Sequence, residues 1–458
     1  MTDLMEYIIN DLECSSVFGR KKIKNITFLK EEEKIQKELD NTEIILNFLK
    51  ENPEKISKLK EILMHFKDIY RTLKKTSVEN IFDDIELFEI KHFCIFSEKL
   101  REEIKNELEN FSPPNLENIV RLLDPEGLKI NSFYIYSVYS EKLKNIRELK
   151  KKIKLQSPID ETAFFEITQI ENEEENIVRQ KLSEEIFNNI EKLIDSYEKI
   201  GYLDFLISKS EQIISNNFSK PIIDDSKIQI KQMFNPEIKN NLEKENEEYQ
   251  KIDFLCEEGV TLITGANMTG KTVILKTLAL IQNMMQYGFY VPAEYASLPI
   301  TDEIFMLSGD LQSIQSGLSS FAAEILFVNK IYKHSKTNKK SLILMDELAR
   351  NTNPHEGKAI VKAMISLLKN KNSFSIITSH YEGVNSYEKN IKNYRVKGLK
   401  KDKTTEITGS YKHIAKFIDY SLVEFKQGEK IPEEALTIAK ILDIDEDIIK
   451  KAKYYLGN

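Results

Sequence analysis

The sequence predicts an all-α region of long helices, followed by an α/β domain built on a largely parallel sheet. Residues 1–215 contain few glycines and prolines and carry apolar side chains at helical spacing. From Val260 onward, short apolar runs of β-forming residues alternate with helical patterns, which is typical of a parallel sheet covered by helices on both faces. A chain of 458 residues is too long for one core, so about two or three domains are expected.

The clearest helical signal lies between Glu173 and Phe205, where apolar residues recur every three or four positions. Glu and Lys occupy the remaining faces, so a long amphipathic helix with a solvated outer face is expected. An earlier stretch, Tyr139 to Leu155, is also helical and is basic on its exposed side. The two stretches can pair as an antiparallel coiled coil. Residues 156–172 between them leave room only for a small hairpin tip.

Two segments before this hairpin are expected to be extended. Leu122 to Gly127 is interpreted as a strand end followed by a turn, because the sequence DPEG places Pro and Gly at favoured turn positions. Phe133 to Tyr139 is expected to form a short strand. Its aromatic side chains are assigned to packing rather than base stacking, because no basic groove accompanies them.

The α/β region has a regular order of elements. Its expected strands are Val260–Thr264, Ser341–Met345, Phe374–Thr378 and the weaker Tyr394–Lys397. Its expected helices are Lys271–Gln286, Ser320–Ile331 and Gly357–Leu368, and residues 432–456 are expected to form two short helices. The predicted domains are therefore a helical core and lever domain over 1–215 with its hairpin tip near 156–172, an α/β domain over 216–425, and a C-terminal helix-turn-helix over 426–458.

Composition and charge narrow the classes of partner. The formal net charge is −8, so no general basic surface indicates nucleic-acid binding. The three cysteines form no CxxC pair, which argues against a disulfide framework or a zinc site and favours reduced, buried thiols. The acidic N-terminus does not resemble a signal peptide, and no run of about 18 apolar residues is present to span a membrane. A cytoplasmic protein without a membrane partner is expected.

The strongest motif directly follows the predicted strand that ends at Thr264. It fits the pattern GxxxxGK[ST] and comprises Gly265, Ala266, Asn267, Met268, Thr269, Gly270, Lys271 and Thr272. Its glycines allow backbone N–H groups to face phosphate oxygens, and the helix that follows adds the positive end of its dipole. Lys271 is expected to bind the β- and γ-phosphates, and Thr272 to bind Mg²⁺. The sequence therefore predicts a P-loop that binds ATP.

Two adjacent carboxylates follow the apolar strand that ends at Met345. Asp346 is expected to hold Mg²⁺, and Glu347 to orient or deprotonate the water that attacks the γ-phosphate. A strand followed by two acids can also be only the start of a capped helix. The P-loop in the same domain favours the catalytic interpretation.

Two further motifs are less specific. His380 ends the next predicted strand, and the carboxyl ends of parallel strands carry ligand sites, so this histidine is expected to sense the γ-phosphate. Taken alone, a histidine at a strand end is equally compatible with a packing role. The serine-rich segment GDLQSIQSGLSSF at 309–321 opens a helix and suits a phosphate, but by itself it is equally a capped loop.

Taken in order, these motifs resemble the ATPase domain of the MutS family, whose fold is an ATP-binding-cassette-like P-loop fold. TGANMTGKT at 264–272 is similar to the family's TGPNMGGKS, DELARNT at 346–352 to DELGRGT, and TSHY at 378–381 to ATHY. The serine-rich segment resembles GDxQSIxxSLSTF of the type-2 branch. Residues 12–49, 173–217 and 432–456 resemble the family's core segment, returning lever helix and C-terminal helix-turn-helix.

The resemblance carries further expectations. It implies a homodimer, or a heterodimer with a related subunit, that uses ATP and Mg²⁺ and dimerises through residues 426–458. It places Ser319 where the family uses a serine to contact ATP bound by the other subunit. Phe234 stands where the family has an Arg-His-Pro-like turn, and it is expected to stack on adenine.

The departures from the family pattern are also informative. The resemblance is to a short form that lacks the mismatch-recognition, connector and C-terminal nuclease domains, and the tip at 156–172 is too short for the usual DNA clamp. Thr269 replaces a P-loop glycine, and Ala349 and Asn351 replace the two glycines of DELGRG. The residues expected to act on ATP are all retained. ATP hydrolysis is therefore expected, and mismatch recognition is not.

Two functions remain open. The first is a DNA-associated ATPase, related to mismatch repair, that clamps or senses duplex DNA as an ATP-gated dimer. The second is an ATP-driven remodelling or reactivation factor for a protein client, as in short family members associated with cobalamin-dependent aminomutases. The short clamp and the acidic net charge argue against binding of duplex DNA, whereas the resemblance to the family argues for it. A third class, a nucleotide-binding scaffold, would not need Glu347.

Overall fold

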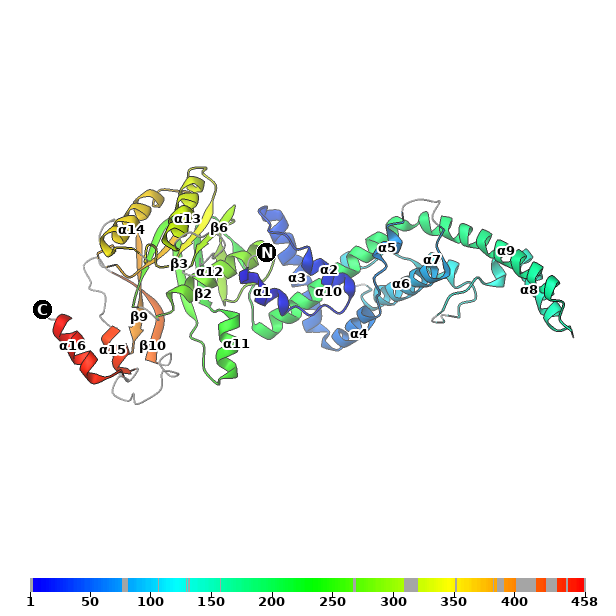
Figure 1. Cartoon of the computed structure of the whole chain (residues 1–458), viewed down its shortest axis with the longest axis horizontal. Coiled ribbons are helices and arrows are strands. Elements are labelled where there is room, and N and C mark those ends of the chain that lie inside the picture. The colour runs from blue at the N-terminus through cyan, green and yellow to red at the C-terminus, as the bar shows by residue number, and fades with distance from the viewer. Residues whose placement is uncertain are drawn as a thin grey trace. The chain divides into compact units, whose positions relative to one another are not determined.

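The computed structural model describes residues 3–75, 81–105, 107–128, 130, 132–156, 158–266, 269–308, 320–350, 352–381, 383–384, 391–400, 417–425, 435–441 and 444–456. The chain divides into two compact units, shown in Figure 1. The helical unit comprises residues 12–26 and 41–211, and the sheet unit comprises residues 1–11, 27–40 and 212–458.

The helical unit is built from amphipathic helices around one apolar core. Its helices are α2 (Val17–Lys24), α4 (Pro53–Met64), α5 (Tyr70–Leu73), α6 (Asp84–Glu103), α7 (Glu117–Leu123), α8 (Glu141–Lys154) and α9 (Glu161–Phe187), with the short 3₁₀ turns η1 (Glu109–Phe111) and η2 (Ser137–Tyr139). Helices α3 (Glu32–Glu51) and α10 (Ile190–Asn216) contribute residues to both units. The core extends from Phe18 to Ile207 in sequence, and the ring of Phe18 lies 4.2 Å from that of Tyr197.

A buried carboxylate fixes the start of this unit. Asp204 accepts hydrogen bonds from the backbone N–H and the hydroxyl of Ser16, at 2.7 and 2.6 Å. The Ser16 hydroxyl also caps α2 by accepting the N–H of Gly19. A Cβ at position 19 would collide with the Asp204 carboxylate, so this close approach requires glycine. Steric exclusion of a Cβ thus explains why the residue between Phe18 and Arg20 is a glycine.

Several local predictions for the helical unit are wrong. The segment 122–127 is not a strand end: it completes α7, whose Ile119 and Leu123 are buried in the core, before a turn closed by Gly127 N–H and Asp124 C=O at 2.9 Å. The aromatic stretch 133–139 is irregular chain that ends in η2 rather than a strand. Tyr136 is buried there, where its hydroxyl meets the Lys91 ammonium at 3.2 Å.

The predicted hairpin has a tip even smaller than expected. Helices α8 and α9 pack against each other, and α9 already begins at Glu161, so only residues 155–160 join them. The long amphipathic pattern after Glu173 does not form one helix, because the chain leaves α9 after Phe187 and starts α10 at Ile190. Asp160 caps α9 by accepting the N–H of Ala163 at 3.0 Å.

The sheet unit contains a six-stranded sheet in the order β10-β9-β4-β8-β7-β6. Its strands are β4 (Gly259–Thr264), β6 (Glu303–Leu307), β7 (Ser341–Met345), β8 (Ser373–Ser379), β9 (Lys392–Leu399) and β10 (Ile418–Glu424). All neighbours are parallel except β10, which pairs antiparallel to β9. The four strands predicted from sequence all lie in this sheet, and the largely parallel arrangement is as expected.

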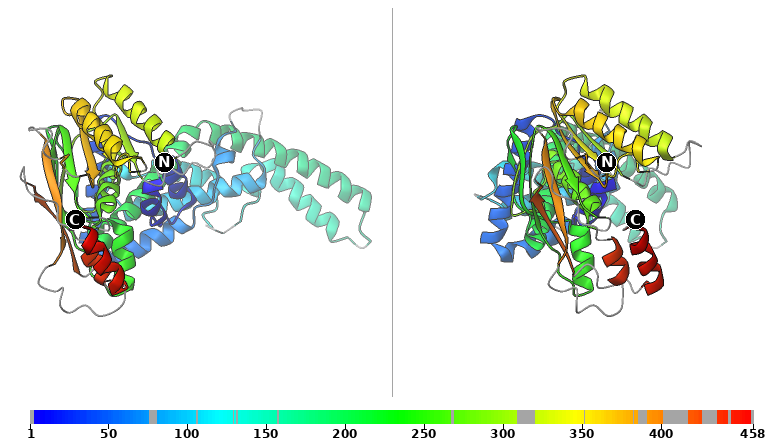
Figure 2. Two further views of the ribbon diagram at one scale, coloured as in Figure 1. Left: turned by 60° about the vertical axis from the view of Figure 1, so that its left-hand side comes forward. Right: turned by 90° about the vertical axis from the view of Figure 1, so that its left-hand side faces the viewer.

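Helices cover this sheet. Helix α12 (Lys271–Gln286) is buried almost throughout its length, and α13 (Ser320–Ser335) and α14 (Pro354–Leu368) lie side by side along the sheet in both views of Figure 2. The apolar core between them combines Ile331 and Ile365 from these helices with Ile343 from β7. The C-terminal helices α15 (Ala435–Ile441) and α16 (Glu446–Leu456) match the two short helices expected there.

A second sheet of four strands, in the order β1-β5-β2-β3, was not expected from sequence. It consists of β1 (Ile222–Ile223), β2 (Lys227–Met233), β3 (Ile252–Glu257) and β5 (Tyr295–Leu298), and α11 (Pro236–Lys244) lies between β2 and β3 in the chain. Residues 1–11 and 27–40 also group with this unit, whereas the sequence assigned them to the helical domain. Tertiary contacts attach these residues to the sheet unit. Helix α1 (Asp3–Asn10) packs on α12, and Leu29 exchanges hydrogen bonds with Gln286.

All three cysteines are buried, and burial raises the pKa of Cys14 and of Cys256 to about 12. Within the described parts of the chain, no helix is both long enough and apolar enough to cross a membrane.

Candidate nucleotide-binding and catalytic site

Three parallel strands bring the predicted site residues to one edge of the large sheet. Strands β4, β8 and β7 are adjacent, and Thr264 at the end of β4 is level with Ser379 at the end of β8. The P-loop follows β4, Asp346 follows β7 and His380 follows β8. The sheet topology therefore places these three segments together at the carboxyl ends of the strands, where ligands bind in folds of this class.

The P-loop curls around its own lysine. The Lys271 ammonium donates hydrogen bonds to the carbonyl oxygens of Gly265 and Ala266, each at 2.9 Å, and the Thr269 hydroxyl donates to Ala266 at 2.7 Å. Gly270 caps α12 with φ 80°, in the left-handed region that favours glycine. The described part of the loop thus has the backbone curvature of a phosphate cradle. Asn267 and Met268 lie outside the described residues.

Burial changes the pKa of the Lys271 ammonium. Its side chain is 4% exposed, and desolvation lowers its pKa, while the nearby carboxylate of Glu347 acts in the opposite sense. The two charged groups are 3.5 Å apart. A buried cation with one acidic neighbour and a row of carbonyl oxygens is well placed to receive further negative charge from phosphate.

A carboxylate and two hydroxyls form the metal-ligand candidate. Asp346 accepts a hydrogen bond from the Thr272 hydroxyl at 2.5 Å on one oxygen and from the Thr378 hydroxyl at 2.8 Å on the other. Mg²⁺ prefers hard oxygen ligands and is usually bound by one or two protein groups together with substrate phosphates and water. Thr272 and Asp346 fit this pattern. Among the described residues, no group of three or more His, Cys, Asp and Glu side chains offers a different metal site.

The residue after Asp346 has an unusual backbone. Glu347 adopts φ 46°, in the left-handed region, and its N–H donates to the Thr378 hydroxyl at 2.8 Å. Its carboxylate lies between Lys271 and the guanidinium of Arg350, which it meets at 2.9 Å. Thr378 therefore connects both predicted acids to β8, donating to one side chain and accepting from the backbone of the other.

Two side chains from other elements hold the rest of this loop. Ala349 also adopts a left-handed conformation, with φ 61°. Its N–H donates to Glu324 of α13 at 2.6 Å, and its carbonyl oxygen accepts the hydroxyl of Tyr381 at 2.7 Å. Burial raises the pKa of Glu324, and the bond from the Ala349 N–H opposes that effect. We name residues 346–350, which carry the two candidate catalytic acids, the catalytic loop.

His380 lies beside this loop. Its ring packs on that of Tyr381, with centroids 4.4 Å apart, and the residue is exposed to solvent. Partial burial lowers the pKa of His380, while the charge of Glu347 acts in the opposite sense. A lowered pKa keeps the imidazole neutral at neutral pH, so one ring nitrogen donates a hydrogen bond and the other accepts.

A cavity of about 830 Å³ opens beside Gly270 at the start of α12. Its lining combines the rings of Tyr249 and Tyr420 with apolar side chains such as Ile274. Phe234 does not line it: that ring is 2% exposed and packs against Phe218. Stacking of adenine on Phe234 stays a prediction, and the burial of the ring argues against it.

Ser319, the residue expected to act across the dimer, lies outside the described residues, as does Asn351. The sequence assigned no role to Thr378, Glu324, Tyr381 or Arg350. Thr378 and Tyr381 lie within the quoted TSHY motif, and their position beside His380 was the only available signal for them. Glu324 acts through a contact between residues 25 positions apart, which no local pattern reveals.

Comparison with known proteins now adds a family. Residues 261–457 match the model described as MutS domain V. The chain is 28% identical to "Endonuclease MutS2" of Caldanaerobacter subterraneus over 97% of its own length and 62% of that relative. It is 33% identical to "Endonuclease MutS2" of Ligilactobacillus salivarius over 47% of the chain and 27% of the relative. It is 26% identical to human "DNA mismatch repair protein Msh3" over 86% of the chain and 32% of the relative. The chain thus spans less than two thirds of these relatives.

Proposed function

Because residues 261–457 form a MutS-family ATPase domain, we propose that this protein binds and hydrolyses ATP as a nucleotide-gated dimer. The observation that carries the proposal is the convergence of Lys271, Asp346, Glu347 and His380 at one edge of the parallel sheet, next to a cavity large enough for a nucleoside. Phosphoryl transfer depends on positioning and on charge stabilisation, and these groups supply both.

Each group has a distinct role in this mechanism. The P-loop N–H groups and Lys271 bind the β- and γ-phosphates, and the lysine exchanges its carbonyl contacts for phosphate oxygens. Thr272 and Asp346 hold Mg²⁺, which when bound neutralises charge on the phosphate oxygens. The base of the nucleotide occupies the cavity between Tyr249 and Tyr420.

Glu347 and His380 act at the γ-phosphate. The Glu347 carboxylate orients the attacking water, and its left-handed backbone, held by Thr378, keeps it on the Lys271 side of the site. His380 donates a hydrogen bond from its neutral ring to the γ-phosphate and so reports whether it is present. Ser319 of a second subunit completes the site, and residues 426–458 join the subunits. Helix α16 supports such an interface because it exposes Ile448, Tyr454 and Leu456.

The catalytic assignment is tested by Glu347→Gln. The amide keeps the shape and a hydrogen-bond acceptor but cannot take a proton, so we expect ATP binding to persist while kcat falls by about 100-fold or more. Binding would be measured by nucleotide titration and turnover by phosphate release. Glu356→Gln, on the exposed first turn of α14, is the matched control. Unchanged turnover in the Glu347 variant would contradict the assignment.

Duplex DNA is the first proposed effector, because relatives of this chain carry the names "DNA mismatch repair protein" and "Endonuclease". The test is the ATPase rate with and without duplex DNA over a series of salt concentrations. Stimulation that weakens steeply with salt supports a DNA role, since phosphate contacts release counterions. The absence of both stimulation and binding at low salt would exclude a DNA role.

A protein client, such as a cobalamin-dependent aminomutase, is the second candidate. The observation that favours it is the tip of the α8–α9 hairpin, where several large apolar side chains are exposed. Exposed apolar clusters of this kind mark contacts with other proteins more than contacts with a phosphate backbone.

A further inference from the structure

We propose that Gln250 is a positioning residue for the base of the nucleotide, because its side-chain amide holds Tyr420 at the distance from Tyr249 at which a planar base fits between the two rings. We name the cavity of about 830 Å³ beside Gly270 the base cavity; all three side chains line it. The inference deepens the proposed function and rests on it, since the spacing of the rings matters only if the base occupies this cavity.

Tyr420 lies in an irregular part of β10. The pairing of β10 with β9 shifts by one residue between Asp419 and Leu422, so Tyr420 and Ser421 together oppose a single residue of β9. Such a β-bulge bends its strand and turns a side chain in a new direction. A Cβ on Gly270 would lie 3.0 Å from the Tyr420 ring. The bulge therefore holds this ring directly against the end of the P-loop.

The Gln250 amide binds all three residues of the segment 419–421. Its Nε2 donates to the Asp419 carboxylate at 2.8 Å and to the Ser421 hydroxyl at 3.0 Å, and its Oε1 accepts the backbone N–H of Tyr420 at 3.1 Å. Burial would raise the pKa of Asp419, but hydrogen bonds from Ser421 and Gln250 outweigh it and lower the pKa. Because an ionised carboxylate only accepts, the amide nitrogen faces Asp419 and its oxygen is left for Tyr420.

Tyr249, the residue before Gln250, supplies a second ring of the base cavity. Its hydroxyl accepts the N–H of Asn235, the N-cap of α11, at 3.2 Å. Burial, and then the nearby Tyr249 hydroxyl, raise the pKa of Tyr420, so the two phenols are neighbours. Aromatic rings stack favourably only over centroid separations of about 4.5–7 Å. Since Tyr249 and Gln250 are adjacent in the chain, the bonds of the amide to β10 set the gap between the rings.

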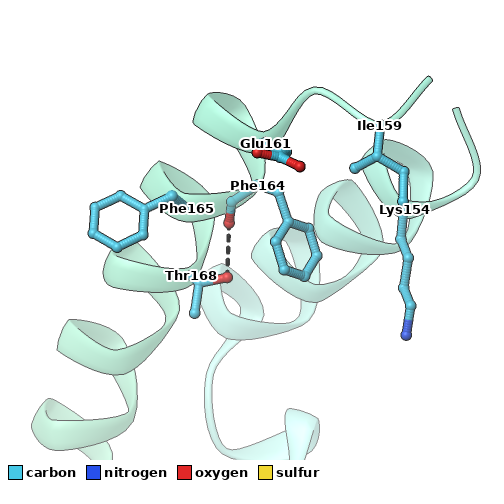
Figure 3. A pocket seen from close by; sticks show the side chains of 6 residues that line it. All are labelled: Lys154, Ile159, Glu161, Phe164, Phe165 and Thr168. Carbon is cyan, nitrogen blue, oxygen red and sulfur yellow. Dashed lines mark hydrogen bonds between the residues drawn. The ribbon is translucent and has the colours of Figure 1, made fainter. Parts of the chain in front are cut away.

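The cavity at the tip of the α8–α9 hairpin provides a contrast (Figure 3). It has a volume of about 500 Å³ and is lined by Lys154, Ile159, Glu161, Phe164, Phe165 and Thr168. The hydrogen bond drawn between its lining residues, from the Thr168 hydroxyl to the Phe164 carbonyl at 2.7 Å, stays within α9. A bond within one helix cannot set the distance between two walls, whereas Gln250 and Asp419 join segments 169 residues apart.

Two ligands separate the base from the phosphates. A non-hydrolysable ATP analogue uses the whole site, whereas inorganic tripolyphosphate uses only the P-loop and the Mg²⁺ ligands. Calorimetric titration of the full-length protein with each ligand in Mg²⁺ gives their affinity ratio, which reports the contribution of the base. Gln250→Met keeps the length of the side chain and removes its hydrogen bonds. We expect it to weaken the analogue about fivefold or more and tripolyphosphate by less than about twofold, with kcat for ATP nearly constant.

A double-mutant cycle tests whether Gln250 acts through Tyr420. If the amide only positions the ring, adding Gln250→Met to Tyr420→Ala should weaken the analogue by less than about a further twofold, because the ring is already absent. An exchange gives a second test. Gln250→Glu places two carboxylates together and should weaken the analogue, and adding Asp419→Asn restores a donor and an acceptor and should recover most of the affinity.

Gln232→Met is the matched control. The Gln232 amide also donates to an aspartate, Asp253, at 2.9 Å, but it does not line the base cavity. We therefore expect this variant to keep the wild-type ratio of the two affinities.

The outcomes separate this inference from the proposed function. A wild type that binds the analogue no more tightly than tripolyphosphate would contradict the placement of the base in the cavity, and this inference with it. A higher wild-type affinity for the analogue that Gln250→Met leaves unchanged would overturn only the role of Gln250. Equal loss of both ligands would assign Gln250 to folding of the domain, and losses that add in the double variant would exclude an action through Tyr420; either result overturns the inference.

Discussion

The hydrogen bond from the Ala349 N–H to Glu324 provides the sharpest test of how the catalytic loop is held. The two atoms are 2.6 Å apart and both residues are buried. Glu324→Ala removes the acceptor and leaves a buried N–H with poor access to water. A hydrogen bond to a charged group contributes about 1.5–3 kcal/mol, and an unsatisfied buried donor costs about 1–3 kcal/mol. The two ranges are alternative measures of the same lost interaction and are not added. We therefore expect the free energy of unfolding to fall by about 2 kcal/mol.

The same substitution should reduce catalysis more than ATP binding. Ala349 has φ 61°, which costs an L-residue about 1–2 kcal/mol, so the loop needs external bonds to keep this shape. Without Glu324, the Tyr381 hydroxyl is the remaining side chain bonded to the backbone of Ala349 among the described residues, so Ala349 can relax toward the right-handed region. Glu347, two residues earlier, then moves away from Lys271. A change of about 1.4–3 kcal/mol in the barrier predicts that kcat falls by about 10- to 100-fold.

The assay pairs steady-state phosphate release with nucleotide titration and thermal unfolding. Glu324→Gln is the control, because its amide oxygen can still accept the Ala349 N–H. We expect this variant to recover most of the turnover that Glu324→Ala loses. Wild-type kcat and stability in Glu324→Ala would refute the positioning role. Equal loss in both variants would show that the negative charge, rather than the hydrogen bond, holds the loop.

Three other predictions concern the same site. Thr378→Val removes the hydroxyl shared by Asp346 and Glu347, so kcat should fall by about tenfold and half-maximal activity should need more Mg²⁺. A Mg²⁺ titration of the ATPase rate measures both effects, and Thr378→Ser should restore both. Tyr420→Ala should weaken nucleotide binding several-fold at nearly constant kcat, because its ring lines the cavity and is not among the groups proposed to act at the γ-phosphate. An equal loss of kcat would contradict this. Burial raises the pKa of Glu324, so the stability it contributes is complete below its ordinary pKa and is lost as pH rises through the raised value. The melting temperature of the wild type should therefore fall relative to that of Glu324→Gln as pH rises from about 4 to 7, and parallel curves would exclude the shift.

The parts of the fold that the sequence predicts are those set by local pattern. The P-loop and the strand before it lie in one short segment, and the apolar runs at 341–345 and 374–378 are long enough to identify buried strands. Parallel pairing then places the carboxyl ends together without further information. Asp346 and Glu347 could be located in this way because they are the first two residues after β7.

The parts that the sequence missed depend on contacts distant along the chain. Leu29 joins the sheet unit through Gln286, and nothing near Leu29 indicates that partner. The DPEG segment has the turn signal expected of it, but the core contacts of Ile119 and Leu123 make the preceding residues helical. Phe234 was placed by analogy with a turn, whereas its burial follows from packing against Phe218.

The position of Glu324 also suggests how two sites in a dimer would communicate. Helix α13 begins at Ser320, directly after Ser319, and Glu324 lies in its first turns. If Ser319 binds the γ-phosphate held by the other subunit, any movement of the start of α13 acts on the Ala349 bond and therefore on Glu347 of its own subunit. Linkage requires the effect to be reciprocal, so ATP in one site must alter affinity in the other by the same factor. We therefore expect wild-type dimers to bind two nucleotides with unequal apparent affinities, and Glu324→Ala, by cutting this connection, to make the two affinities equal. Two equal sites in the wild type would show that α13 carries no such coupling.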